Sequence, residues 1–71
     1  MSTEKGRVMN NIRDLRTKRG LSQAALAEQV GATRQTINAI EQEKYAPSLE
    51  LAFRIARAFG VPFEDVWRFA P

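Results

Sequence analysis

The sequence predicts an all-α fold of five short helices, and three observations support this. Apolar residues recur three or four positions apart, in segments separated by short breaks that contain glycine or proline. Serine or threonine precedes several of these segments, as is typical of helix N-caps. No segment alternates between apolar and polar residues, so we expect no strand. With 71 residues, the chain has room for one small domain.

The first two helices are expected over residues 8–19 and 23–30. A glycine follows each of them and provides the usual helix stop. Ser22 stands where the N-cap of the second helix belongs. Residues 1–7 are polar, so we expect a flexible tail there and a folded domain over residues 8–71.

The third helix is expected over residues 34–42, with Thr33 as its N-cap. A loop that contains a proline separates it from a fourth helix over residues 49–59, which Ser48 would cap. The last segment, "PFEDVW" at residues 62–67, begins with a proline that a first helical turn tolerates, so it predicts a short fifth helix.

The amino-acid composition limits the classes of function that fit this chain. Residues 1–35 carry seven Lys and Arg against three acids, whereas residues 36–71 carry four against five. A basic half suggests an anionic partner, although charge alone also fits an ordinary solvated surface. The chain has no histidine and no cysteine, so we expect no metal site, no cofactor and no enzyme activity. No apolar run is long enough to span a membrane, and the absence of cysteine fits a cytoplasmic protein.

A short turn joins the second and third helices. Gly31 can adopt a positive φ there at no steric cost, and the small Ala27 lets the helices approach closely. Ile37 and Ile40 would anchor the third helix inward. Two helices joined in this way describe a helix-turn-helix.

Three stretches carry a resemblance to a known family: "IRDLR" (12–16), "GLSQAALAEQVGATRQTINAIE" (20–41) and "PSLELAFRIARAFGV" (47–61). They resemble the phage-repressor-like helix-turn-helix proteins, the Cro-like or XRE family, and in particular its short stand-alone bacterial or archaeal regulators. The resemblance implies a five-helix, lambda-repressor-like DNA-binding domain whose third helix enters the major groove. It also implies that the protein binds as a dimer.

Three polar side chains of the third helix are candidates for reading bases. On a helical wheel Arg34, Gln35 and Asn38 share one side, opposite Ile37 and Ile40. Arg pairs with guanine, and Asn or Gln with adenine, so these residue types suit base edges. The alternative is the plain polar face of an amphipathic helix, and we favour base contact because of the motif around it.

A second set of side chains is expected to contact phosphates. The resemblance implies that Gln23 and the neighbouring N–H groups at its helix start hold the DNA backbone. For Thr33 the alternative is a plain N-cap, and for Tyr45 it is a cover over the edge of the core. A minor-groove arm at residues 1–7 is the less favoured reading of the tail. The expected phosphate contacts are Gln23, Thr33, Thr36, Lys44 and Tyr45.

Two charged residues are expected at the margin of the core. Arg16 falls within the apolar side of the first helix, and Glu41 lies close to Ile37 on the third, so they suggest a pair. The resemblance implies the same pairing, and we interpret it as structural. Two residues later Glu43 stands where the family often has glycine, so it must adopt a positive φ or let the helix continue.

The C-terminal third is rich in aromatic residues. A 71-residue chain buries only about 60 % of its unfolded surface, so a patch around Trp67 and Phe69 is expected to stay exposed. We favour a dimer interface formed by Phe63, Trp67 and Phe69 over a local hydrophobic cap. A two-fold dimer would set two recognition helices about 34 Å apart, one turn of DNA.

The sequence therefore predicts a regulator of transcription that binds double-stranded DNA sequence-specifically as a homodimer. We expect it to bind a palindromic operator and to act as a repressor. The alternative is an antitoxin or other protein-interaction module that uses the aromatic C-terminus to hold a protein partner. A regulator would need Arg34, Gln35 and Asn38, whereas an interaction module would tolerate changes there.

Overall fold

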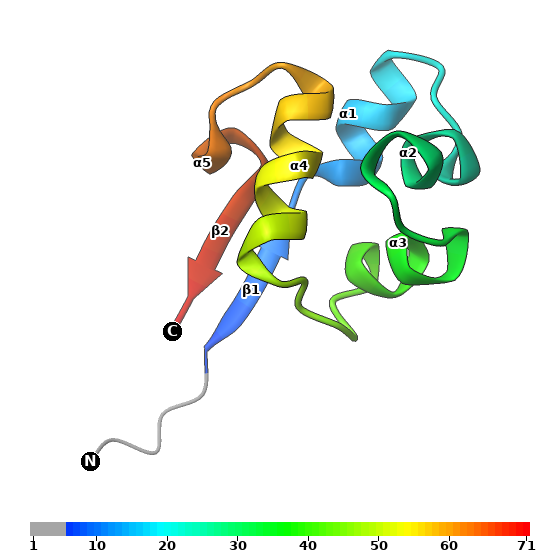
Figure 1. Ribbon diagram of the computed structural model, residues 1–71. Coiled ribbons are helices and arrows are strands. Elements are labelled where there is room, and N and C mark those ends of the chain that lie inside the picture. The colour runs from blue at the N-terminus through cyan, green and yellow to red at the C-terminus, as the bar shows by residue number, and fades with distance from the viewer. Residues whose placement is uncertain (1–5) are drawn as a thin grey trace.

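The computed structural model describes residues 6–71, and five helices and one pair of strands lie in this part (Figure 1). The mostly helical class predicted from the sequence is confirmed. The elements are β1 (Arg7–Asn10), α1 (Ile12–Lys18), α2 (Gln23–Val30), α3 (Arg34–Glu41), α4 (Leu49–Phe59), α5 (Phe63–Val66) and β2 (Trp67–Ala70).

Side-chain caps fix the starts of three helices. Ser22, Thr33 and Ser48 each accept a hydrogen bond from the backbone N–H three residues further on. Each bond satisfies one of the N–H groups that a helix start leaves without a partner. The helix starts predicted from these residues are therefore correct.

The core lies between α4 and the other helices. In Figure 1, α4 runs through the middle, with α1, α2 and α3 on one side and α5 and the strands on the other. Every helix contributes at least one buried apolar side chain. The largest side chains that are fully buried are Ile12, Leu26, Ile37, Ile40, Ile55, Phe59 and Val66.

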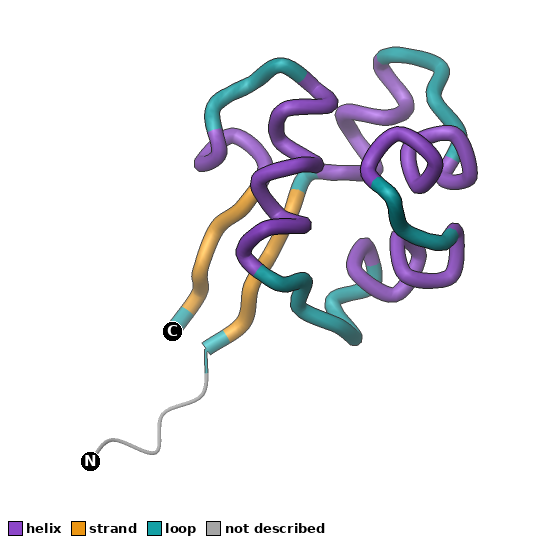
Figure 2. Tube along the Cα trace, in the orientation of Figure 1, coloured by secondary structure: helices purple, strands orange, loops and turns teal. Residues whose placement is uncertain are grey.

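The terminal strands correct the sequence analysis, which expected none. β1 and β2 pair antiparallel, with Val8 opposite Phe69, and run side by side in Figure 2. The first helix consequently begins at Ile12, not at residue 8. The backbone N–H of Asn11 donates to the Val66 carbonyl (2.9 Å) and keeps the chain extended up to that point. The partner of β1 lies about sixty positions away, so spacing within residues 7–10 gives no sign of it.

Trp67 is a second correction. It belongs to β2, not to the last helix, and it is only 5 % exposed. Its Nε1–H donates to the Ala52 carbonyl (3.0 Å), so the ring belongs to the core against α4. Phe69, on the same face of the strand, is 67 % exposed. Of these two residues, only Phe69 is exposed.

Two negative findings apply to residues 6–71. No helix in this part is long and apolar enough to cross a membrane. The same residues contain no cluster of three side chains of the His, Cys, Asp or Glu type that could hold a metal ion. Residues 1–5 of the expected tail lie outside the described part, and β1 begins at Arg7.

The burial of Trp67 can be tested by truncation. We expect Trp67→Ala to lower the free energy of unfolding by about 3–5 kcal/mol, because it leaves a cavity in the core. Tyr45→Ala is the control: it truncates a half-exposed aromatic in the loop after α3 and should change stability by about 0.5 kcal/mol or less. Urea unfolding measures both. Equal losses for the two variants would contradict the assignment of Trp67 to the core.

Candidate nucleic-acid interface

α2 and α3 meet at a tight turn. Gly31 has a φ of 75°, in the left-handed region, and the Ala32 N–H donates to the Ala27 carbonyl (2.9 Å) to close the end of α2. A side chain at this φ would be strained, so glycine suits the position. Thr33 then caps α3, with only Ala32 between it and Gly31. The turn expected between the helices is therefore present.

α3 has one buried and one open side. Ile37 and Ile40 are fully buried, whereas Arg34, Gln35 and Asn38 are exposed. The division expected from the helical wheel is therefore present in the structure. In the view of Figure 1, α3 and α5 lie at opposite sides of the molecule.

An ion pair attaches the end of α3 to α1. The Arg16 guanidinium donates to both carboxylate oxygens of Glu41, through Nε to Oε2 (2.6 Å) and Nη2 to Oε1 (3.1 Å). Its Nη1 donates to the Leu21 carbonyl, just before α2 (3.0 Å). The Glu41 side chain is only 6 % exposed. Bidentate charge-assisted bonds are strong and directional, so this pair fixes α3 relative to both other elements.

A polar network extends from the ion pair to the open side of α3. The Gln23 Nε2 donates to Glu41 Oε1 (3.2 Å) and to Asn38 Oδ1 (3.1 Å). The Gln42 Nε2 donates to the same Asn38 oxygen (3.3 Å). These residues line a small polar cleft of about 250 Å³, together with Arg13 and Arg16. Asn38 is thus an exposed side chain whose orientation is fixed by its neighbours.

Gln23 is used differently from what the sequence suggests. Both of its side-chain N–H groups are engaged with α3, so this amide has no further donor for a phosphate. Only the backbone N–H groups of the first turn of α2 stay suited to an anion, because a helix start leaves them without internal partners. The side chain joins α2 to α3.

α3 ends in an unusual way. Glu43 has a φ of 61°, the only positive value of a non-glycine residue in the described part. The Lys44 N–H donates to the Ala39 carbonyl and the Glu43 N–H to the Ile40 carbonyl, both at 2.9 Å, which is the Schellman pattern. The sequence analysis left two possibilities open, and Glu43 adopts the costly one.

Two contacts from β1 reinforce this end of the helix. The Asn10 Nδ2 donates to the Ile40 carbonyl (2.9 Å), so that oxygen accepts two hydrogen bonds. Arg7 Nε lies 3.6 Å from Glu43 Oε1. The sequence analysis missed Asn10, because nothing near it in the sequence indicates a contact thirty positions away.

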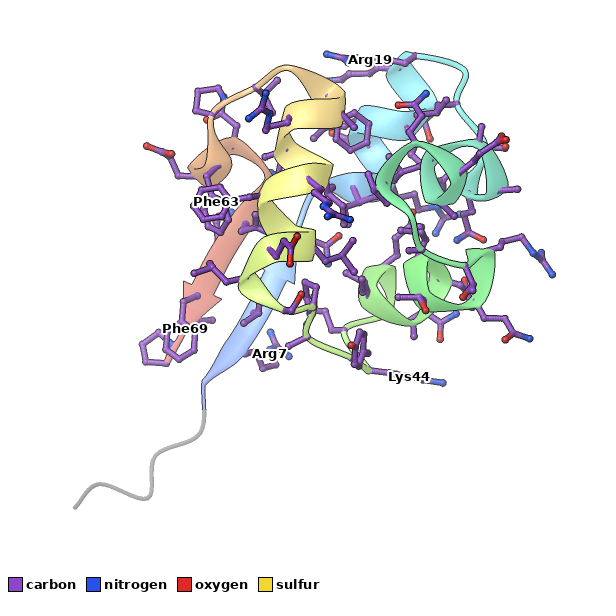
Figure 3. All side chains as sticks on the ribbon, viewed as in Figure 1. Arg7, Arg19, Lys44, Phe63 and Phe69 are labelled. Carbon is purple, nitrogen blue, oxygen red and sulfur yellow. The ribbon has the colours of Figure 1, made fainter. Side chains whose placement is uncertain are left out.

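The remaining expected phosphate contacts flank α3. The hydroxyls of Thr33 and Thr36 lie 3.0 Å apart at its start. Lys44 and Tyr45 follow its end and are both exposed. Figure 3 shows the Lys44 side chain extending away from the body of the molecule. Hydroxyl and ammonium groups at both ends of an exposed helix could donate to phosphates that flank a groove.

Comparison with known proteins places this arrangement in a family. The model of a family described as "Helix-turn-helix" matches residues 12–66. An uncharacterized HTH-type transcriptional regulator of Bacillus subtilis, YgzD, is 50 % identical over 58 residues, which cover 82 % of this chain and 88 % of the relative. The cryptic phage CTXphi transcriptional repressor RstR of Vibrio cholerae is 35 % identical over 57 residues, or 80 % of this chain and 51 % of RstR.

A solved structure of a regulatory protein is also similar to this chain. The restriction-modification controller protein C.AhdI from Aeromonas hydrophila superposes with a TM-score of 0.73 at 31 % identity. The match covers 78 % of this chain and 83 % of the controller protein.

The ion pair can be tested by removing one partner. We expect Glu41→Ala to cost about 3–5 kcal/mol of stability, because it leaves the Arg16 guanidinium largely buried without its counter-charge. The melting temperature should fall by more than about 10 °C. The control is Glu50→Ala, which breaks the exposed pair with Arg54 and should change stability by about 1 kcal/mol or less. An unchanged melting temperature for Glu41→Ala would show that the pair does not hold α3.

Proposed function

The chain belongs to the helix-turn-helix family of transcriptional regulators, and we propose from this premise that it binds double-stranded DNA sequence-specifically. In this proposal α3 enters the major groove, whose width admits an α-helix. The RstR relative is a phage repressor, which supports repression as the output.

One observation carries the proposal: α3 presents three long polar side chains outward while its opposite side is fixed in the core. Arg34 and Gln35 lie in its first turn, where recognition helices contact bases, and Asn38 lies one turn further on. Arg suits the O6 and N7 atoms of guanine, and Gln suits adenine. Because Ile37 and Ile40 are buried, α3 cannot rotate these groups away from the groove.

Phosphate contacts would position the helix in this groove. The backbone N–H groups at the start of α2, near Gln23, suit one phosphate. Donors at both ends of α3 suit the neighbouring phosphates, and Glu43 adds one unfavourable charge near them. The donors at the two ends of α3 are Thr33, Thr36, Lys44 and Tyr45.

We propose a homodimer in which a second copy covers the apolar groove beside β2. This groove has a volume of about 450 Å³ and is lined by Leu49, Phe63, Trp67 and Phe69 among others. Leu49 and Phe69 are each 67 % exposed, which is unusual for large apolar side chains. Phe63 and Phe69 lie on the same side of the molecule in Figure 3. A two-fold dimer would bind a palindromic operator.

The same groove supports a second candidate function, a module that holds a protein partner, such as an antitoxin. Salt distinguishes the two. Neutralising Z phosphates makes log K fall with log salt at a slope of about −0.9Z, so DNA binding should weaken steeply between low and physiological salt. Binding of a protein partner through the apolar groove should respond little to salt.

The base contacts can be tested with a double variant. We expect Arg34→Ala with Gln35→Ala to weaken binding to a selected operator by about 100-fold or more, because two contacts worth about 1–3 kcal/mol each are lost. The free energy of unfolding should be unchanged. The matched control is Arg57→Ala with Gln29→Ala, which removes the same residue types from exposed positions outside α3. Footprinting on the operator measures both pairs. Protection retained by the first pair would refute the proposal.

The dimer can be tested at its most exposed aromatic. We expect Phe69→Glu to give a monomer in sedimentation equilibrium, because a second copy would have to bury the new charge. The fold should persist, since Phe69 is mostly exposed. Gln29→Glu places the same charge outside the groove and should leave the dimer intact. A native chain with a concentration-independent monomer mass would contradict the dimer.

A further inference from the structure

We propose that Asn38 selects a keto base, guanine or thymine, and rejects the amino bases adenine and cytosine. The inference rests on the proposed function and deepens it. Its basis is the side-chain amide of Asn38, whose carbonyl oxygen is already occupied by two neighbours. Asn38 therefore faces solvent as a donor.

The orientation of this amide follows from the buried ion pair. Both carboxylate oxygens of Glu41 accept hydrogen bonds from Arg16, and a carboxylate offers no donor. The Gln23 amide lies against Glu41, so its nitrogen must point toward the carboxylate, and Nε2 lies 3.2 Å from Glu41 Oε1. The second N–H of the same nitrogen points to Asn38 (3.1 Å), and only the oxygen of Asn38 can accept it. The charge on Arg16 thus decides which end of the Asn38 amide faces outward.

Gln42 closes the second acceptor position. Its Nε2 donates to the Asn38 oxygen at 3.3 Å from one helical turn further along α3. An amide oxygen has two lone pairs, and here both have partners. The Nδ2 group and its two N–H bonds are left to contact DNA, because no other group in the described part is bonded to them.

An asparagine whose amide oxygen is already hydrogen-bonded can contact a base only through its N–H groups, unlike a free asparagine. The usual asparagine contact pairs with adenine through the oxygen and the nitrogen together, and it would require one of the two glutamines to be displaced. In the major groove, guanine presents the acceptors N7 and O6, and thymine presents O4. Adenine also has the acceptor N7, but its amino group would face the second N–H of Asn38, and cytosine presents only an amino donor. Gln23 and Gln42 are positioning residues in this scheme, and Asn38 is the residue that selects.

The test is selection of bound sequences from random double-stranded DNA with the native chain and two variants. Comparing native with Asn38→Ala identifies the position that Asn38 reads, since its preference should disappear there. In the native chain we expect guanine or thymine at this position by at least about fivefold over adenine and cytosine. Asn38→Asp keeps the shape and both accepted bonds but has no donor. It should invert the preference to cytosine, whose amino group can donate to the carboxylate.

A third variant tests the role of the network. Gln42→Ala frees one lone pair of the Asn38 oxygen, so adenine should gain at least about fivefold at the same position. Gln29→Ala, also exposed but outside α3 and its polar cleft, is the control and should leave the selected sequence unchanged. A gain of adenine would confirm that Gln42 restricts Asn38.

Three outcomes would overturn the inference. The native chain could select adenine at the Asn38 position, Asn38→Ala could leave every position unchanged, or it could weaken all sequences equally, as loss of a phosphate contact would. In each of these cases an operator is still enriched, so the proposed function stands. Failure of the native chain to enrich any sequence would instead refute the proposed function, and this inference with it.

Discussion

The buried pair of Arg16 and Glu41 is the interaction on which the rest of the candidate interface depends. It joins α1 to the end of α3, and Arg16 also holds the Leu21 carbonyl in the turn before α2. A buried pair of this kind contributes little net stability, because desolvation offsets most of the attraction. Its main effect is to orient side chains: it orients Gln23, and Gln23 in turn orients the amide of Asn38. The selective surface is thus continuous with the core margin.

β1 connects the two surfaces to which we assign function. Asn10 donates to the Ile40 carbonyl near the end of α3, whereas the side chain of Asn11, the residue after β1, donates to the Asp65 carbonyl in α5. Val8, further along the same strand, lines the apolar groove beside β2. A partner seated on that groove would therefore touch the strand that holds the end of α3.

Much of the fold could be predicted because its signals are local. A capping hydroxyl acts on an N–H three residues away, and the turn at Gly31 depends on one φ angle. The helix starts and the outward side of α3 follow from such signals. The strands do not, since each depends on a partner about sixty positions away. The burial of Trp67 does not either, because its contact with Ala52 depends on the packing of β2 against α4. Within the candidate site, the position of Asn38 was predictable, but its partners were not.

The sequence by itself determined the helices, the helix-turn-helix and the residue types offered to DNA, because spacing and side-chain chemistry are properties of neighbouring residues. Only the tertiary structure decided how those residues are presented. It bonded the Gln23 side chain to α3, and it buried most of the Trp67 ring. It also gave Glu43 a positive φ and placed Arg7 of β1 beside its carboxylate. The physical reason is common to all three: each depends on a contact between residues far apart in the chain.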